Sequence, residues 1–164
     1  MSTEGCLDTG EERTWDAATL AFRLLDQQVE RDVQASSGLP LTYYELLVLL
    51  SKAHRRSLRM SELAEITHTR PSRISHAVGK LAEGGYVERV HCEHDRRSWF
   101  AKLTDKGMET LRTAGVEHVR SMRENMFELL SPEQQAQLLD ISRTLLSRLA
   151  PGAEDHATRV LQEF

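Results

Sequence analysis

The spacing of the apolar residues changes twice along this chain, and these changes limit the folds that the chain can adopt. From Trp15 to Leu81, apolar side chains recur every three or four residues, which is the spacing of helices. Over residues 86–91 and 99–103 they alternate with polar ones, as in strands, and a charged segment separates the two runs. Helical spacing returns after residue 104. We therefore expect a mainly helical fold with one β-hairpin.

The helices expected before the hairpin differ in how deeply they should be buried. The first covers about residues 14–35, and residues 1–12 before it are polar and expected to be disordered. The second follows Thr42 and Glu45, which have the spacing of a capping box. Residues 46–50 are apolar on most sides of this helix. We expect it to be central and buried.

Two shorter helices lead directly into the hairpin. The first covers about residues 62–67, after a short segment at residues 58–60 that could form an edge strand. The second begins at Pro71, where a missing N–H group costs least, and residues 84–85 are glycines that end it. A helix, a tight turn, a helix and a hairpin, in this order, are the elements of a winged helix-turn-helix.

Two helices are expected after the hairpin. The first covers about residues 105–130, with apolar residues through Val119 and Leu129 expected to face inward. Ser131 and Gln134 then form a capping box that begins a last helix, which ends near residue 149. The fold class is therefore mainly α, with a winged helix-turn-helix core and a β-hairpin wing between N- and C-terminal helices. Residues 151–164 are expected to form a C-terminal tail.

Charge is distributed unevenly along the chain. Residues 53–106 hold eleven Lys and Arg against seven Asp and Glu, a balance of +4, although the whole chain carries −4. The residues outside this segment therefore sum to −8. A basic segment in an acidic protein indicates a surface that meets an anion, while a merely uneven surface is the alternative.

The second helix of the pair and the hairpin tip carry the residues expected to bind DNA. An α-helix is narrow enough to enter the major groove, and adjacent arginines suit the electronegative minor groove. We expect polar and basic side chains on the exposed faces of this helix to donate to base edges and phosphates. The candidates are Ser72, Arg73, Ser75, His76 and Lys80 on the helix, and Arg96 and Arg97 on the hairpin.

The outer helices have apolar stripes that are longer than one small winged helix can cover. A self-complementary twofold interface is the usual way to bury such stripes, so we expect a homodimer. The expected interface residues are Trp15, Phe22, Leu138, Ile141, Leu145 and Leu149. We thus expect one domain over residues 13–150, with a DNA-binding part at about 53–106 and dimerisation helices at about 14–35 and 105–150.

The hairpin region resembles that of the MarR (multiple antibiotic resistance regulator) family. Its wing signature is D-x-R, then about six residues, then L-T-x-x-G. The residues at these positions here are Asp95, Arg97, Leu103, Thr104 and Gly107. Residues 75–81 resemble the recognition helix of the family, and residues 85–89 resemble its G-[LY]-V-x-R exit. The resemblance covers about residues 15–149.

The resemblance implies roles for three residues of the wing. Arg97 would enter the minor groove, Asp95 would orient Arg97 through a charge-assisted hydrogen bond, and Arg96 would contact a phosphate. This chain departs from the family at His76, where arginine is frequent, and at Gly79, where aspartate is frequent. These departures leave the bases that the protein reads unpredicted.

The resemblance also implies a function. Members of the family are homodimeric bacterial transcription factors that bind duplex DNA and usually repress transcription. Many also bind a small aromatic or anionic effector between the dimerisation helices and the DNA-binding part. We expect a repressor that binds a pseudo-palindromic operator, with half-sites about 10–10.5 bp apart, and responds to such an effector.

Other functions receive less support from the sequence. The chain lacks G-x-S-x-G, H-E-x-x-H, P-loop and G-x-G-x-x-G motifs, so we expect neither an enzyme nor a cofactor. The remaining alternatives are a winged helix that binds a protein instead of DNA, and a regulator that responds to oxidants or metals through Cys6, Cys92 or residues 91–95. No run of residues is apolar enough to span a membrane, and the N-terminus lacks the pattern of a signal peptide, so we expect a cytoplasmic protein.

Overall fold

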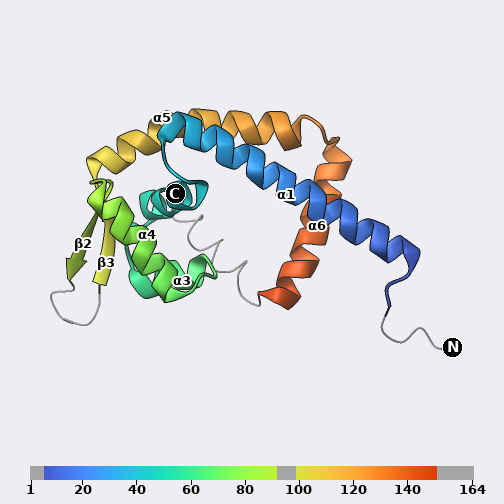
Figure 1. Cartoon of the computed structure of the whole chain (residues 1–164), viewed down its shortest axis with the longest axis horizontal. Coiled ribbons are helices and arrows are strands. Elements are labelled where there is room, and N and C mark those ends of the chain that lie inside the picture. The colour runs from blue at the N-terminus through green and yellow to red at the C-terminus, as the bar shows by residue number, and fades with distance from the viewer. Residues whose placement is uncertain (1–5, 92–98, 151–164) are drawn as a thin grey trace.

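The computed structural model describes residues 6–91 and 99–150, and Figure 1 shows how its elements are arranged. Two long helices, α1 (Thr9–Ser37) and α5 (Asp105–Met122), pack along each other. The shorter helices and the sheet gather near one end of this pair (Figure 1). At the opposite end, α6 (Pro132–Leu149) extends away from α5.

Helix α1 is longer at both ends than its apolar stripe predicts. The Asp8 side chain accepts from the backbone N–H of Glu11, and the Glu11 side chain accepts from that of Asp8, each at 2.8 Å. This reciprocal cap begins the helix at Thr9, so the expectation of disorder was wrong for residues 9–12. The helix ends at Gly38, whose φ of 70° is left-handed and favours glycine.

Helix α2 (Leu41–Lys52) begins by a different cap from the one that the sequence predicts. Its N-cap residue is Pro40, and Thr42 and Glu45 form no capping box. Instead, the backbone N–H of Leu41 donates to a carboxylate oxygen of Glu30, on α1, at 2.9 Å. A local motif cannot reveal this cap, because its acceptor comes from another helix. The expected burial of α2 is confirmed by Leu46, Leu47 and Leu50, which are at most 3% exposed.

The helix-turn-helix consists of α3 (Met60–Ile66) and α4 (Pro71–Glu83). Helix α3 begins two residues before the expected start, because a carboxylate oxygen of Glu62 accepts from the backbone N–H of Arg59 at 2.7 Å. His68 lies in the turn with a left-handed φ of 48°. Helix α4 begins at Pro71 and ends before Gly84, as the sequence predicts.

A three-stranded antiparallel sheet forms the base of the wing. The strands are β1 (Ser57–Arg59), β2 (Val87–His91) and β3 (Trp99–Leu103), in the order β1-β3-β2. The expected edge strand and hairpin are both confirmed. In the register, Trp99 lies opposite His91 at the end of the hairpin nearest the tip. A single 3₁₀ turn, η1 (His54–Arg56), leads into β1.

Two hydrophobic clusters join these elements. The larger one lies under α4 and the sheet, and its most buried members are Leu47, Leu50, Leu63, Val78, Leu81 and Ala101. The smaller one joins α1, α2 and α5 through Val29, Val33, Tyr44 and Ala114. Because α2 contributes to both clusters, it connects the winged helix to the long helices.

The C-terminal helices pack less than the sequence predicts. Helix α5 ends at Met122 and passes into a π-helical turn, η2 (Arg123–Phe127). The prediction of one regular helix to about residue 130 was therefore wrong. Val119 and Leu129, which were expected to face inward, are 47% and 71% exposed in the single chain. The capping box at Ser131 is confirmed, and no residue of α6 is buried. Within residues 6–91 and 99–150, no helix is both long and apolar enough to span a membrane.

Candidate nucleic-acid interface

Helix α4 presents one face to the core and the rest of its surface to solvent. Ile74, Ala77, Val78 and Leu81 are 9% exposed or less, and they pack into the larger cluster. This stripe has the spacing of three and four residues that one face of a helix requires. It fixes the rotation of α4 about its axis, and so determines which side chains face outward.

The five residues of α4 that the sequence assigns to DNA binding are all exposed, but they lie on two flanks. They are Ser72, Arg73, Ser75, His76 and Lys80. Ser72, Arg73 and His76 line a cavity on the side of α2, whereas Ser75 lines a groove on the side of the wing. The structure therefore brings the first three together and separates Ser75 from them.

Lys80 differs from the other four because it already has a partner. Its ammonium group lies 2.8 Å from a carboxylate oxygen of Glu83, one turn further along the helix. The hydrogen bond to Glu83, followed by the negative charge of Glu83, raises the pKa of Lys80 above its usual value. Any contact of Lys80 with a phosphate must therefore compete with Glu83.

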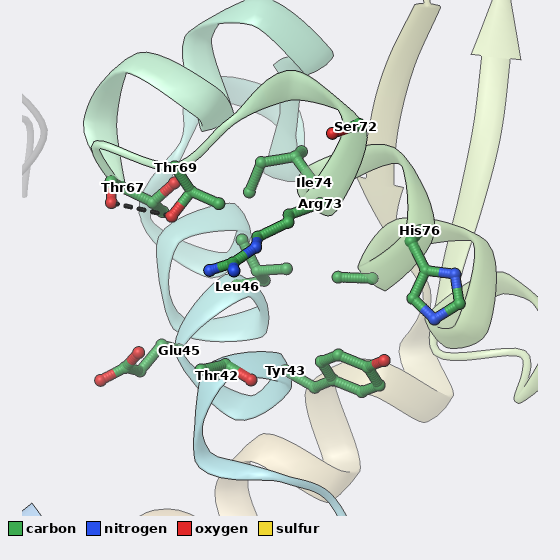
Figure 2. A pocket seen from close by; sticks show the side chains of 11 residues that line it. Thr42, Tyr43, Glu45, Leu46, Thr67, Thr69, Ser72, Arg73, Ile74 and His76 are labelled. Atoms are coloured by element: carbon green, nitrogen blue, oxygen red, sulfur yellow. Dashed lines mark hydrogen bonds between the residues drawn. The ribbon is translucent and has the colours of Figure 1, made fainter.

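The cavity between α2 and α4 has a volume of about 510 Å³ (Figure 2). Arg73 extends from α4 across this cavity toward α2, above Leu46 (Figure 2). Tyr43 and His76 line the opposite end. The walls thus combine apolar side chains with one guanidinium group and several hydroxyl groups, which could hold a small aromatic or anionic molecule.

Glu45 lines the same cavity, and the pKa of its carboxyl group is shifted. Glu45 is exposed at its surface, but partial desolvation by the surrounding protein raises its pKa above the usual value, and the charges of Asp26 and Glu30 on α1 raise it further. In Figure 2 the carboxylate of Glu45 points away from the Arg73 guanidinium. Arg73 has no ion pair with Glu45 or with any other carboxylate in the part of the chain that the structure describes.

The wing residues predicted to contact DNA, Arg96 and Arg97, lie outside the described residues. So do Asp95, which was predicted to orient Arg97, and Cys92. The base of the wing lies within the described residues, and it carries two arginines that the sequence alone did not assign to DNA binding. Arg59 of β1 and Arg89 of β2 line the groove beside Ser75. They are thirty residues apart in sequence, and only the pairing of both strands with β3 brings them together. Arg89 occupies the last position of the G-[LY]-V-x-R motif, and this match was the signal in the sequence that could have identified it.

The residues predicted to form a dimer interface lie on the outer helices. Trp15 and Phe22 of α1 are 65% and 46% exposed, and Leu149 of α6 is 77% exposed. Ile141 and Leu145 are exposed as well, and Leu138 is partly buried. Large apolar side chains are therefore exposed on both α1 and α6 in the single chain.

Comparisons with known proteins agree with this architecture. A family model described as MarR family matches residues 37–98. A crystal structure of Sco3205, a MarR family transcriptional regulator from Streptomyces coelicolor in complex with DNA, is 41% identical in sequence. The similarity covers 89% of this chain and 91% of that chain, with a TM-score of 0.86.

Two further relatives support the same assignment. AbsC, a MarR family transcriptional regulator from Streptomyces coelicolor, is 37% identical over 88% of this chain and 97% of its own, with a TM-score of 0.84. The transcriptional repressor MprA of Escherichia coli K12 is 28% identical over 120 residues, which cover 73% of this chain and 68% of that protein. The fold, the signature of the wing and these similarities together show that the chain belongs to the MarR family of transcriptional regulators.

Proposed function

We propose that this regulator binds a specific duplex DNA sequence in the cytoplasm as a homodimer and represses transcription from it. The observation that carries the proposal is the exposed row of polar and basic side chains on α4, next to a wing with a basic base. A relative of 41% identity was crystallised in complex with DNA, which supports the same activity here.

The expected docking places α4 in the major groove. Ser75 and His76 would reach base edges, while Ser72, Arg73 and Lys80 would anchor the helix on or beside the phosphates. Arg96 and Arg97 would contact the adjacent backbone and minor groove, with Asp95 orienting Arg97. In a twofold dimer, the two α4 helices meet successive major grooves, which requires half-sites about 10–10.5 bp apart.

The test is selection of a random duplex library by the purified protein at two salt concentrations, followed by sequencing. We expect enrichment of a pseudo-palindrome and a steep, log-linear decrease of affinity with salt, because each phosphate contact releases counterions. Steep salt dependence without enrichment would contradict sequence-specific reading. Absence of binding at both concentrations would overturn the proposal and favour a winged helix that binds a protein.

The cavity between α2 and α4 supports a second proposal, that a small aromatic anion regulates DNA binding. A carboxylate could pair with Arg73, and its ring would lie against Leu46, Ile74 and Ala77, which line the same cavity. Arg73 and His76 belong to the face that is proposed to meet DNA. A molecule that holds them in the cavity would therefore weaken DNA binding.

Benzoate is the probe for this cavity, and benzamide is its uncharged control. We expect calorimetry to detect binding of benzoate but much weaker binding of benzamide, and Arg73→Gln to abolish the difference. The matched control is Arg112→Gln, which removes a cation from the exposed side of α5. Equal binding of the two compounds to the wild type, or binding of neither, would contradict the proposal.

A further inference from the structure

A groove of about 410 Å³ separates the first turns of α4 from the base of the wing. Ser75 lines it from α4, Arg89 and Trp99 line it from the hairpin, and Arg59 lines it from β1. None of the three residues outside α4 belongs to the face that the sequence predicts to contact DNA. The groove also lies on the opposite flank of α4 from the cavity that contains Arg73.

Both arginines of the groove are held against aromatic rings of β3. The guanidinium carbon of Arg89 lies 4.9 Å from the ring centroid of Trp99, and that of Arg59 lies 5.5 Å from the ring centroid of Phe100. The ring of His91 packs on the same Trp99, with 3.4 Å between ring centroids. Contact with a ring restricts a guanidinium while leaving its N–H groups available, because these donors point outward in the guanidinium plane.

The two cations are not neutralised within the described part of the chain. No described carboxylate lies within 4 Å of either guanidinium group. The nearby carboxylate of Glu62 is engaged as the cap of α3, where it accepts from the backbone N–H of Arg59 rather than from its side chain. Trp99 and Phe100 are successive residues of β3, so their rings lie on opposite faces of the sheet. Of the two stacked guanidinium groups, only that of Arg89 lies on a ring that lines the groove. This restricted guanidinium group provides a site for an anion with several acceptor oxygens, which phosphate supplies.

The position of the groove identifies the source of that phosphate. With α4 in the major groove and the wing at the adjacent minor groove, the structure between them is the sugar–phosphate backbone that separates the two grooves of DNA. We propose that Arg89 binds a backbone phosphate of the DNA in this groove, and that Trp99 positions the guanidinium group of Arg89. This inference rests on the proposed DNA-binding function.

A phosphate contact makes a prediction that a base contact does not. Loss of Arg89 should weaken binding to all duplex sequences by a similar factor, and it should leave the preferred bases unchanged. It should also reduce the slope of log K against log salt by about 0.9, since one phosphate contact fewer is made. We expect a loss of affinity of about tenfold, the size of one charge-assisted hydrogen bond.

The first experiment measures fluorescence anisotropy of the selected duplex at 50–200 mM salt. The variants are Arg89→Gln and Arg89→Lys, with Arg112→Gln as a control for loss of one positive charge. We expect lower affinity and a smaller slope for Arg89→Gln, and no change for the control. A wild-type slope in Arg89→Gln would overturn the inference while leaving the proposed function intact. If the wild type does not bind any duplex, both fail.

The second experiment identifies which backbone phosphate Arg89 contacts. Each backbone phosphate of the duplex is replaced in turn by an uncharged methylphosphonate, and binding is measured for the wild type and Arg89→Gln. We expect a phosphate whose replacement weakens the wild type about tenfold but has no further effect on Arg89→Gln. If Arg89→Gln does not fold, Arg89→Lys serves instead, because lysine keeps the charge but cannot form the planar bidentate contact. Additive losses at every position would overturn the inference.

The same scan tests the positioning role of Trp99. We expect Trp99→Leu to abolish the coupling between Arg89 and this phosphate, and Trp99→Phe to retain it, because phenylalanine keeps a ring for the guanidinium. A merely structural role would lower stability without altering which phosphate couples to Arg89. Full coupling in Trp99→Leu would therefore show that Trp99 does not position Arg89.

Discussion

Thr104 and Gly107 fasten the exit of the recognition helix to the start of α5. The hydroxyl group of Thr104 donates to the carbonyl oxygens of Gly85 and Tyr86, and it accepts from the backbone N–H of Gly107 at 3.0 Å. Gly107 passes so near to Tyr86 that a Cβ atom would lie 2.2 Å from its carbonyl oxygen. The two residues that match the wing signature here thus have a structural role.

This close approach predicts the cost of a methyl group at Gly107. We expect Gly107→Ala to lower the free energy of unfolding by about 1–3 kcal/mol, because Tyr86 and Leu103 must both move away from the added methyl group. Gly79→Ala is the matched control, since nothing lies within 4 Å of its ideal Cβ position. Because Gly79 lies in the interior of α4, Gly79→Ala should raise the free energy of unfolding by up to about 1 kcal/mol. Urea unfolding at fixed protomer concentration measures both, and equal effects of the two would contradict the packing argument.

A buried hydroxyl group connects α1 to α5. Ser121 is 1% exposed, and its hydroxyl group donates to a carboxylate oxygen of Asp32 at 2.6 Å. This bond, followed by one from Gln28, lowers the pKa of Asp32 below its usual value. A carboxyl group whose pKa is lower in the folded state stabilises the fold above its unfolded pKa of about 3.8, and this stabilisation is lost as the pH falls through the folded pKa.

The lowered pKa gives a pH-dependent prediction for this hydrogen bond. We expect Ser121→Ala to lower the free energy of unfolding by about 1.5–3 kcal/mol at pH 7, where Asp32 is charged. The loss should shrink as the pH falls below 3.8 and Asp32 becomes protonated in both states. The control Ser147→Ala removes an exposed hydroxyl group on α6, and it should change little. A loss that is independent of pH would exclude the carboxylate as the partner.

At the scale of the element, α4 combines a buried stripe with an exposed polar surface that is proposed to read DNA. The sequence predicts its start at Pro71, its end before Gly84 and the exposure of His76, because these features depend on local chemistry and periodicity. The start of α2 could not be predicted in the same way, since Glu30 of another helix supplies its cap. The π-helical turn at residues 123–127 also interrupts the helical spacing without a proline or glycine to mark it.

Helix α4 also carries a prediction about base preference. We expect His76→Ala to change the preferred base at one position of each half-site, at a cost of about 1–3 kcal/mol for each lost contact. Repeating the library selection with this variant measures the change. If the enriched motif and the affinity match those of the wild type, His76 does not read a base. The changed preference would distinguish His76 from Arg89, whose loss should leave the motif intact.

Across the whole molecule, the parts of the proposed DNA-binding surface differ in how well the sequence predicts them. The candidate residues of α4 all lie on one short helix, so its periodicity predicts that they are exposed, although they fall on two flanks. Arg59 and Arg89 join this surface only through the strand order β1-β3-β2, which pairs strands that are distant in the chain. Charge counted along the sequence indicates a basic segment, but it cannot identify the arginines that share a groove.

The outer helices carry the surface through which we propose that two copies of this molecule associate. Helix α6 buries none of its residues in the single chain, although Ile141 and Leu145 are each 56% exposed. On α1, Trp15 and Phe22 are similarly exposed. Removal of such side chains from water contributes about 1.5–3 kcal/mol for each residue that becomes fully buried. In a twofold interface each contact occurs twice by symmetry, so a few residues would be enough to stabilise the proposed dimer.

A single charge on α6 should therefore separate the protomers. We expect Leu145→Glu to reduce the mass in sedimentation equilibrium from twice 18.7 kDa to 18.7 kDa, because each dimer would bury two unpaired carboxylates. The control Val90→Glu places the same charge at an exposed valine of the wing and should remain dimeric. The monomer should bind one half-site with an intact α4 surface, but it should lose the added affinity of the palindrome. A Leu145→Glu protein with the full dimer mass would exclude this part of α6 from the interface.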